Sequence, residues 1–533
     1  MRPFSDHSFI IFFLVATLLL QFNCTSTKIV RKHLNNNQVN SDTFLNLKNA
    51  IKVHMLDGGL YVINNPIISI TKDSLIARGI YYNTNREKIR TSEKINTIRI
   101  DGQSAYKIPL SDVALVETNK ITGLSGKLVA MSLVGVPSVI SSVYCLTNPK
   151  ACFGSCPTFY AWNGESMKLM AEGFSSSILP VFENSDVDML YWAKNEGRKD
   201  FQIKLTNEAL ETHIIRYADL LVFPKHGNER IFATEDGKFY KTSKIISPTV
   251  CSGSEGDCRN LILQMDAQER YSEADSKNLA AREYVDLEFD CSAKNQLGLI
   301  IGSRQTLLTT YLFYQSLAFL GNNAGYFASR IESGDKALQR RVEKIWDLLG
   351  TIEVFVQGQS GKWIKTGEID EMGPIASDVH LVTLPPQEPG TIKVRLKMTR
   401  GLWRIDYIGL TDITEPVEPI QINPTFITTN DSINDLALNQ LCHSDEPLIT
   451  LPGDSHTLNF ILPDISNDYE IFIKSKGYYL EWMREEWIAE QNKTKATLMF
   501  GMPKLYLKLV ANKFKAVEPT MEEVFWRSRY VKN

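Results

Sequence analysis

Apolar and polar positions alternate with a period of two along much of this chain, most clearly over residues 48–120, 201–249 and 351–412. Such alternation is typical of strands that bury one face, and Asp-Gly pairs that favour turns separate several of the runs. Apolar residues instead recur at helical spacing over 338–349, and residues 306–320 are apolar enough to form a buried helix. The pattern therefore predicts a mainly β fold with helical insertions, α+β overall.

The strands expected between residues 48 and 122 are short and are separated by frequent turns. The order of a DGG turn, the segment DSLIARG and the segment IPLSDVALVE resembles small SH3-like barrels found in bacterial envelope proteins. We therefore expect a small SH3-like N-terminal barrel followed by β-sandwich-type domains.

Two long apolar stretches interrupt this pattern. Residues 9–20 form a nearly unbroken apolar run, whose length suits a signal peptide and is short for a membrane span. Residues 128–146 contain no charged residue over about the length of a span. A transmembrane helix is one interpretation of this second stretch, and a buried helical pair or hairpin interrupted by Ser, Gly and Pro137 is the other.

Cys24 closely follows the first apolar run, and the residues after it are polar and rich in Asn. This placement resembles the lipobox of bacterial lipoproteins, whose Cys carries the lipid and becomes the new N-terminus. The resemblance implies lipid attachment at Cys24, an outer-membrane anchor, and a periplasmic or surface-exposed body. A plain secretory signal and an uncleaved anchor are the alternatives, and the polar stretch suits a flexible tether.

The remaining cysteines also favour an exported protein. Cys251 and Cys258 bracket a polar Gly/Ser loop, which predicts a small disulfide in an oxidising compartment. Cys145, Cys152 and Cys156 crowd one stretch, where we expect two of them to pair. A zinc site is disfavoured there, because the spacing lacks a Cys-x2-Cys pair and a neighbouring His.

Composition narrows the class of protein without naming an activity. The 533 residues include 58 Lys and Arg and 61 Asp and Glu, for a net charge of −3, and 43% are apolar. These values argue against a disordered chain and against a polytopic membrane protein. The nearly neutral charge also argues against a broadly basic nucleic-acid binder, so no nucleic-acid partner is expected.

Several segments far apart in the sequence resemble one group of uncharacterised bacterial envelope proteins. They include CFGSCPTFY (152–160), AEGFSSSI (171–178), GPIASDVHL (373–381) and GYYLEWMREEW (477–487). The likeness covers roughly residues 150–530 and implies a family rather than an activity.

A second likeness concerns the strand RGLWRIDYIGL at residues 400–410. It resembles the closing strand of galactose-binding-like jelly-roll domains, which implies a β-sandwich near residues 350–412. Domains of that kind bind sugars or act as spacers.

Familiar catalytic signatures are missing from the sequence, including the Gly-x-Ser-x-Gly elbow and the His-Glu-x-x-His helix. Carboxylates cluster at Glu183, Asp186 and Asp188, and two of these would project to the same side of a strand. Such a cluster is a candidate calcium site. Asp186 and Glu368 are candidates for a hydrolase that uses two carboxylates, and solvated turns are the plainer interpretation.

Aromatic residues give one further candidate. Trp482 and Trp487 lie in the segment GYYLEWMREEW and are the tryptophans most suited to stacking against a ligand. The alternative is that both belong to the core, as large aromatic residues commonly do.

From these features we expect a non-catalytic cell-envelope lipoprotein with a structural or interaction role. A carbohydrate-binding surface protein, with or without calcium, is the first alternative, and a hydrolase is the second. The expected partners are the membrane, through the lipid anchor, and a protein or glycan. The predicted divisions are a signal peptide (1–23), a tether (24–47), a barrel (48–122), an apolar segment (123–146), a β-rich domain (147–300), a helical insertion with a jelly roll (301–415), a linker (416–446) and a C-terminal domain (447–533).

Overall fold

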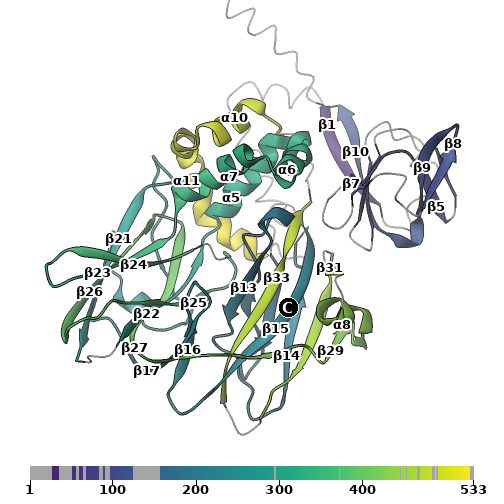
Figure 1. The fold of residues 1–533 in the computed structure, drawn as a ribbon. Helices are drawn as coiled ribbons and strands as arrows, with labels where there is room; N and C mark the ends of the chain where they lie inside the picture. Colours follow the sequence, from purple (N-terminus) through teal and green to yellow (C-terminus); the bar gives the residue numbers. More distant parts are fainter. Residues whose placement is uncertain are drawn as a thin grey trace, which may run out of the picture. The chain divides into compact units, whose positions relative to one another are not determined.

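The computed structural model describes residues 27–34, most of 51–123 and most of 156–527 (Figure 1). The gaps within the last two stretches are 56–58, 64–67, 72, 83–87, 90–95, 210, 293–295, 371–372, 444–445, 452, 465–467, 483–486 and 488–489. The predicted signal peptide, Cys24, the apolar segment 128–146, Cys145 and Cys152 lie outside the described residues. Among the helices that are described, none is long and apolar enough to cross a membrane.

The chain divides into two compact units, and the smaller one holds the N-terminal strands. Its first sheet has the order β1 (Thr27–Leu34), β10 (Val113–Gly123), β2 (Ile51–Met55), β3 (Leu60–Ile63), β6 (Ile80–Tyr82) and β7 (Lys88–Ile89). Its second sheet has the order β4 (Ser69–Ile70), β5 (Ser74–Ala77), β9 (Gln103–Pro109) and β8 (Thr97–Ile100). The ring of Tyr61 lies 4.6 Å from that of Tyr81 and 5.0 Å from that of Tyr106, and the three residues belong to the apolar core of this unit.

One strand of this unit falls where we expected a flexible tether. β1 pairs with β10 in an antiparallel register from Thr27 opposite Gly123 to Leu34 opposite Val116. The segment TKIVRKHL mixes β-branched and basic residues, a composition that a strand tolerates well. The polar tether therefore does not occupy the whole of residues 24–47.

The larger unit begins with a sandwich of two sheets that share one apolar core. The first sheet has the order β12 (Met167–Glu172), β11 (Thr158–Trp162), β14 (Asp200–Thr206), β32 (Ser455–Ile461), β29 (Phe426–Thr429) and β30 (Ser432–Ile433). The second has the order β13 (Asn184–Met189), β33 (Asp468–Glu481), β15 (Glu211–Lys225) and β28 (Ile420–Ile422), with β31 (Leu448–Thr450) also beside β15. Alternating apolar residues of both sheets, such as Ile203, Leu205, Leu220 and Ile473, are fully buried between them.

A second pair of sheets follows in the same unit and also shares a core. One sheet has the order β17 (Phe239–Ile246), β16 (Arg230–Ala233), β25 (Asp378–Thr383), β22 (Leu297–Gln305), β27 (Trp403–Val417) and β20 (Arg270–Tyr271). Because β17 also pairs with β27, five of these strands close into a ring. The other sheet has the order β19 (Gly256–Asp257), β18 (Val250–Gly253), β21 (Arg282–Cys291), β26 (Gly390–Thr399), β23 (Ile352–Gln357) and β24 (Trp363–Ile369).

Five helices of the larger unit lie in two segments of the chain. Between β22 and β23 lie α5 (Leu308–Leu320), α6 (Ala324–Glu332) and α7 (Lys336–Leu349), which confirms the two helices predicted there. α10 (Lys493–Gly501) and α11 (Pro503–Arg527) follow β33 and gather with the first three at one end of the unit (Figure 1). Their inward side chains join the core of the second pair of sheets. The fold is thus mainly β with helical insertions, as the sequence predicts.

Several of the predicted domain boundaries separate strands that share a sheet. β32 pairs with β14, and β33 pairs with β15 along fourteen residue pairs, although more than 200 residues separate the partners in sequence. Residues 447–481 therefore complete the sandwich that residues 158–225 begin. Sequence periodicity marks each strand but does not say which distant strand it pairs with, and this is why the boundaries at 300, 415 and 446 do not match the sheets.

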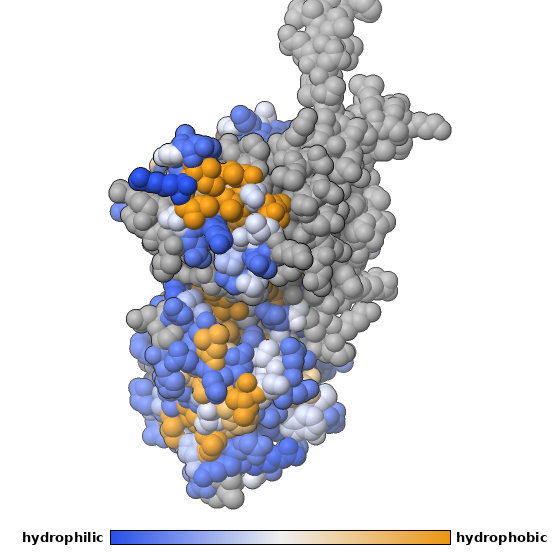
Figure 2. Space-filling view, turned by 90° about the vertical axis from the view of Figure 1, so that its right-hand side faces the viewer, coloured by the Kyte–Doolittle hydropathy of each residue, from blue (hydrophilic) through white to orange (hydrophobic). Residues whose placement is uncertain are grey.

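The far edge of the first sandwich is formed by β29, β30 and α8 (Asp435–Cys442). Figure 2 views the molecule from this side, and its lower part shows orange apolar side chains in small groups among blue polar ones. Ile433 and Leu436 are 69% and 65% exposed at this edge. The apolar surface is broken up by polar residues, which is ordinary for a protein surface.

Candidate functional site

The main unit contains a cleft of about 700 Å³ and, beside it, a small recess of about 60 Å³. Ser175, Ser176, Thr309 and Trp346 line both spaces, so the recess and the cleft are neighbours. The walls come from the loop after β12, the loop before β25, the start of α5, the end of α7 and the end of β33. Four segments that we singled out in the sequence, beginning at residues 152, 171, 373 and 477, therefore meet at one place.

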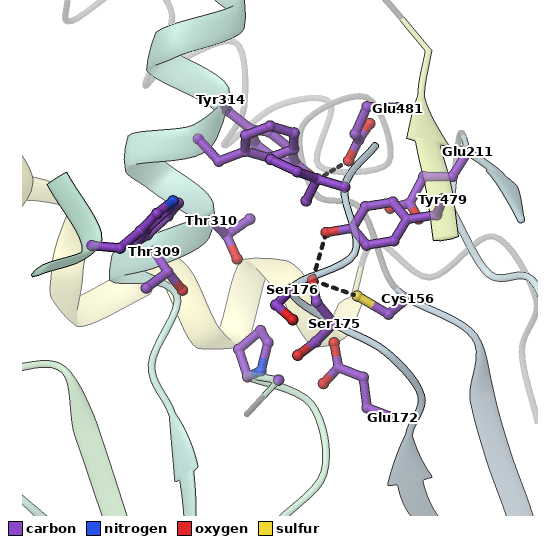
Figure 3. A pocket seen from close by; sticks show the side chains of 15 residues that line it. Cys156, Glu172, Ser175, Ser176, Glu211, Thr309, Thr310, Tyr314, Tyr479 and Glu481 are labelled. Carbon is purple, nitrogen blue, oxygen red and sulfur yellow. Dashed lines mark hydrogen bonds between the residues drawn. The ribbon is translucent and has the colours of Figure 1, made fainter. Parts of the chain in front are cut away.

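Glu172 lies at the base of the recess and is only 3% exposed (Figure 3). Its Oε2 accepts a hydrogen bond of 2.7 Å from the backbone N–H of Ile375, while Oε1 has no hydrogen-bond partner among the described residues. Gly373 makes the approach possible, because a Cβ on that residue would lie 2.0 Å from Oε2. Burial raises the pKa of Glu172 to about 7, although the Ile375 N–H and the Cys156 thiol act in the opposite direction.

The wall of the recess beside Glu172 is held by hydrogen bonds to the backbone of Ser175. The Tyr479 hydroxyl donates to the Ser175 carbonyl at 3.0 Å, and the Cys156 thiol lies 3.9 Å from the same oxygen (Figure 3). Burial and the nearby Glu172 raise the pKa of Cys156 well above its ordinary value. The sulfur is therefore a protonated thiol, which makes it a poor nucleophile.

The loop between β12 and β13 connects the recess to the cleft. Phe174 in this loop has a φ of 37°, a conformation that an aromatic residue rarely adopts. Its backbone N–H donates to Asp186 Oδ2 at 2.7 Å, and the N–H of Val187 donates to Oδ1 at 3.0 Å. The carboxylate of Asp186 thus fixes the strained loop and places the serines beside it on the wall of both spaces.

Charged groups concentrate in the cleft around His380. Its Nε2 lies 2.8 Å from Asp378 Oδ2, and its Nδ1 lies 3.5 Å from Glu235 Oε2. Burial by itself lowers the pKa of His380, but the carboxylates of Asp378, Glu235 and Asp186 outweigh burial and raise it to about 9. The imidazole is therefore a cation at neutral pH, held between carboxylates.

The carboxyl groups around this cation differ in protonation. Asp378 also accepts hydrogen bonds from the backbone N–H groups of Met189 and Val379, and its pKa is lowered because His380 outweighs burial. Burial and Asp378 together raise the pKa of Asp186 to about 6. Asp188 is more deeply affected, since burial and Asp186 raise its pKa well above the ordinary value. The site therefore combines ionised and protonated carboxyl groups at neutral pH.

A neutral polar atom adds to the cleft. Gln305 lines it and is only 3% exposed, and its buried side-chain oxygen has no hydrogen-bond partner among the described residues. A buried amide oxygen without a partner costs free energy, so a ligand group that donates a hydrogen bond to it would be stabilised.

The structure separates the predicted calcium ligands. Glu183 forms an ion pair of 2.8 Å with Arg216, whereas Asp186 is held by backbone N–H groups and Asp188 is buried. Over the part of the chain that is described, no group of three or more His, Cys, Asp or Glu residues is arranged to hold a metal ion. The predicted calcium site at Glu183, Asp186 and Asp188 is therefore wrong, because these neighbours in sequence do not converge on one point and Glu183 and Asp186 have other partners.

The two tryptophans proposed for ligand stacking are also placed differently. Trp482 is buried and its Nε1 donates to Thr212 Oγ1 at 2.8 Å. Trp487 is buried against Tyr314, with 4.8 Å between ring centroids. Both belong to the core, whereas Trp346, on the helix whose periodicity suggested only packing, and Phe174 line the cleft.

Other predicted residues are brought together in part. Glu368 lies on β24 and pairs with Lys365 at 2.6 Å, and it does not line the cleft with Asp186. Cys251 and Cys258 are both buried at opposed positions of the β18–β19 hairpin, with the Cys258 N–H donating to the Cys251 carbonyl at 3.0 Å. These two are present as thiols, and a disulfide between them remains a prediction.

Sequence reasoning missed the most telling residues of the cleft. Neither His380 nor Glu172 is among the candidate site residues that the sequence indicates. The signal for the first is the spacing of Asp378 and His380, which puts both on one face of a strand. The signal for the second is a lone Glu at the end of the apolar-rich strand MKLMAE, where burial of a carboxyl group is expected to be unusual.

Comparisons with known proteins add little to this picture. No protein-family model matches the chain, and no curated protein matches it. Among solved structures, BuGH86 in complex with neoagarooctaose is similar over 43% of this chain and 33% of its own, with 9% identity and a TM-score of 0.16. The GH31 alpha-xylosidase from Xanthomonas citri is similar over 80% of this chain and 36% of its own, with 7% identity and a TM-score of 0.13. The chain spans about a third of the length of these proteins.

Proposed function

We propose that the protein is a non-catalytic cell-envelope lipoprotein, anchored through Cys24, that binds a carbohydrate in the cleft. The observation that carries the binding role is the lining of the cleft, where serine hydroxyls, ionised carboxylates and an imidazolium surround a volume of about 700 Å³ beside Trp346. A cavity of this size suits a ligand of a few sugar rings.

Each kind of lining group supports a hydroxyl-rich ligand. Carboxylates accept hydrogen bonds from sugar hydroxyls, and the hydroxyls of Ser175 and Ser176 both donate and accept. An indole offers an apolar face against which the C–H face of a sugar ring can pack. The unpaired oxygen of Gln305 provides one more acceptor at a fixed position. A hydrophobic ligand would leave these groups without partners, which costs free energy.

The binding role is tested with the full-length protein purified in detergent and applied to a glycan array. We expect binding to a defined set of glycans and at least a tenfold loss of affinity in Trp346→Ala. Trp363→Ala is the matched control, because Trp363 is a partly buried Trp on β24 that does not line the cleft. The proposal fails if no glycan binds, or if both variants bind equally well.

The anchor is tested separately. Metabolic labelling with a radioactive fatty acid should mark the wild-type protein and leave the Cys24→Ala variant unmarked. Normal processing of that variant, together with an unlabelled wild-type protein, would remove the lipoprotein proposal and leave a plain exported protein.

A hydrolase is the second candidate function, and one observation favours it. Glu172 faces the recess with an unpaired oxygen and a pKa of about 7, the properties required of a residue that both donates and accepts a proton near neutral pH. Asp186, with a pKa of about 6, is a candidate for a second carboxyl group. Incubation with each glycan that binds should release shorter products from the wild type and none from Glu172→Gln. If the wild type releases nothing, the protein only binds.

A further inference from the structure

The outward face of α11 carries large apolar side chains that nothing described covers. Met502, at the junction of α10 and α11, is 56% exposed, and Leu505 and Leu509 are 41% and 59% exposed. Spacings of three and four residues put them on one side of the helix. The opposite side is also apolar, since Leu507, Val510, Ala511 and Phe514 are buried in the core. The helix therefore packs against the body and still presents an apolar stripe outward.

Lysines accompany this stripe. Lys504, Lys508 and Lys513 are exposed on the same outer half of the helix, and residues 502–517 contain no Asp or Glu. The first acidic residue after them, Glu518, is buried and pairs with Lys515 at 3.0 Å. The outer face of these turns is consequently both apolar and positively charged.

The neighbouring helices extend the positive charge. α7 packs against both α10 and α11, and it exposes Arg340, Arg341 and Lys344 with one acidic residue, Glu343, among them. α10 adds the exposed Lys493. The nearest exposed carboxylate on the sheet side, Glu273, is already paired with Lys515 at 2.5 Å.

We propose that this face, defined by Met502, Leu505 and Leu509 with Lys504, Lys508 and Lys513, docks on an anionic lipid bilayer. An apolar stripe bordered by lysines is what a helix lying in a membrane interface presents, because the apolar side chains enter the acyl boundary while the lysines reach the headgroups. A second copy of this chain is a poorer occupant, since it would bring six of these lysines together. The proposal does not depend on the cleft or on lipid attachment at Cys24.

The test uses full-length Cys24→Ala protein, so that no acyl chain contributes, with vesicles of phosphatidylglycerol and phosphatidylcholine in equal amounts or of phosphatidylcholine alone. Each lysine near an anionic surface contributes roughly fivefold in partitioning. We therefore expect at least tenfold tighter sedimentation with the anionic vesicles. Leu505→Ser/Leu509→Ser and Lys504→Glu/Lys508→Glu should each lose at least tenfold, and both should keep the wild-type circular dichroism, because the replaced side chains are exposed.

The control variant is Ile433→Ser/Leu436→Ser, which removes two apolar side chains that are more exposed than Leu505 and Leu509, at the edge formed by β30 and α8. It should bind vesicles like the parent. Equal binding by all variants, or equal binding to both kinds of vesicle, would overturn the proposal. Self-association in solution that the Leu505→Ser/Leu509→Ser variant abolishes, without any vesicle binding, would assign the face to a second copy and would also overturn it.

Discussion

Replacing Glu172 by Gln should stabilise the protein at neutral and alkaline pH. The carboxyl group is 3% exposed, and only one of its oxygens accepts a backbone hydrogen bond, from Ile375. Glutamine has nearly the same shape, and its side-chain oxygen can keep that bond. It carries no charge, so the substitution removes the cost of ionising a buried group without opening a cavity.

The size of the gain follows from the pKa. Burial raises the pKa of Glu172 from 4.5 to about 7, so between these values the folded protein binds more protons than the unfolded chain. The free energy of unfolding therefore falls as the pH rises through this range, and the whole cost is present above pH 7. A shift of this size corresponds to about 3 kcal/mol. Below pH 4.5 the residue is protonated in both states and the gain should vanish.

Urea unfolding followed by tryptophan fluorescence measures the free energy of unfolding of the wild type and of Glu172→Gln at pH 4.5 and at pH 8. Glu172→Gln should exceed the wild type by about 3 kcal/mol at pH 8 and by nearly nothing at pH 4.5. Glu368→Gln is the control, because Glu368 is largely exposed on β24 beside Lys365 and should change stability by less than about 1 kcal/mol at either pH. An equal gain at both pH values, or a loss at pH 8, would show that ionising the buried carboxyl group of Glu172 does not cost stability.

Three further predictions concern other buried groups. Oxidation of Cys251 and Cys258 should stabilise the protein by about 2.5 kcal/mol for a loop of this length, so reductant should lower the unfolding midpoint. Complete alkylation of both cysteines in protein purified without reductant would contradict this prediction. Arg270→Met should cost about 3 to 5 kcal/mol in urea unfolding, because it strands the buried Glu283 carboxylate that Arg270 now contacts at 2.8 Å. His380 should give imidazolium signals in nitrogen-15 spectra at pH 7.5, and the unfolding free energy that its proton contributes should be lost as the pH rises toward 9; neutral imidazole signals at pH 7.5 would refute the arrangement.

Much of the architecture could be predicted because strands and helices leave a local signal. The helix over 336–349 shows Leu338, Ile345 and Leu349 buried at the spacing that its sequence indicates. The pairing of β33 with β15 leaves no such signal, because both strands are apolar enough to fit many partners. A contact between residues about 250 positions apart depends on the packing of the whole unit, so no local pattern in a single sequence predicts it.

The sequence indicates only some of the residues that form the cleft and the recess. The segments around Glu172, Asp378 and Tyr479 stand out by their resemblance to one group of envelope proteins, yet nothing local shows that they meet. Neighbours in sequence were misleading instead: Glu183 and Asp186 are three residues apart, but one pairs with Arg216 and the other holds the backbone of a loop. Residues close in sequence predicted a calcium site, whereas the folded chain brings carboxylates together with the imidazolium of His380.

Several residues around the cleft and the recess are in arrangements that lower the stability of the folded protein. Glu172 is ionised only at a cost, Phe174 has a φ of 37°, and the Gln305 oxygen lacks a partner among the described residues. Each of these lowers stability by an amount that an ordinary substitution would recover. Costs of this kind collect where a protein must present polar groups to a ligand instead of to itself. Their concentration around the cleft and the neighbouring recess makes this the part of the molecule in which substitutions should gain stability and lose binding together.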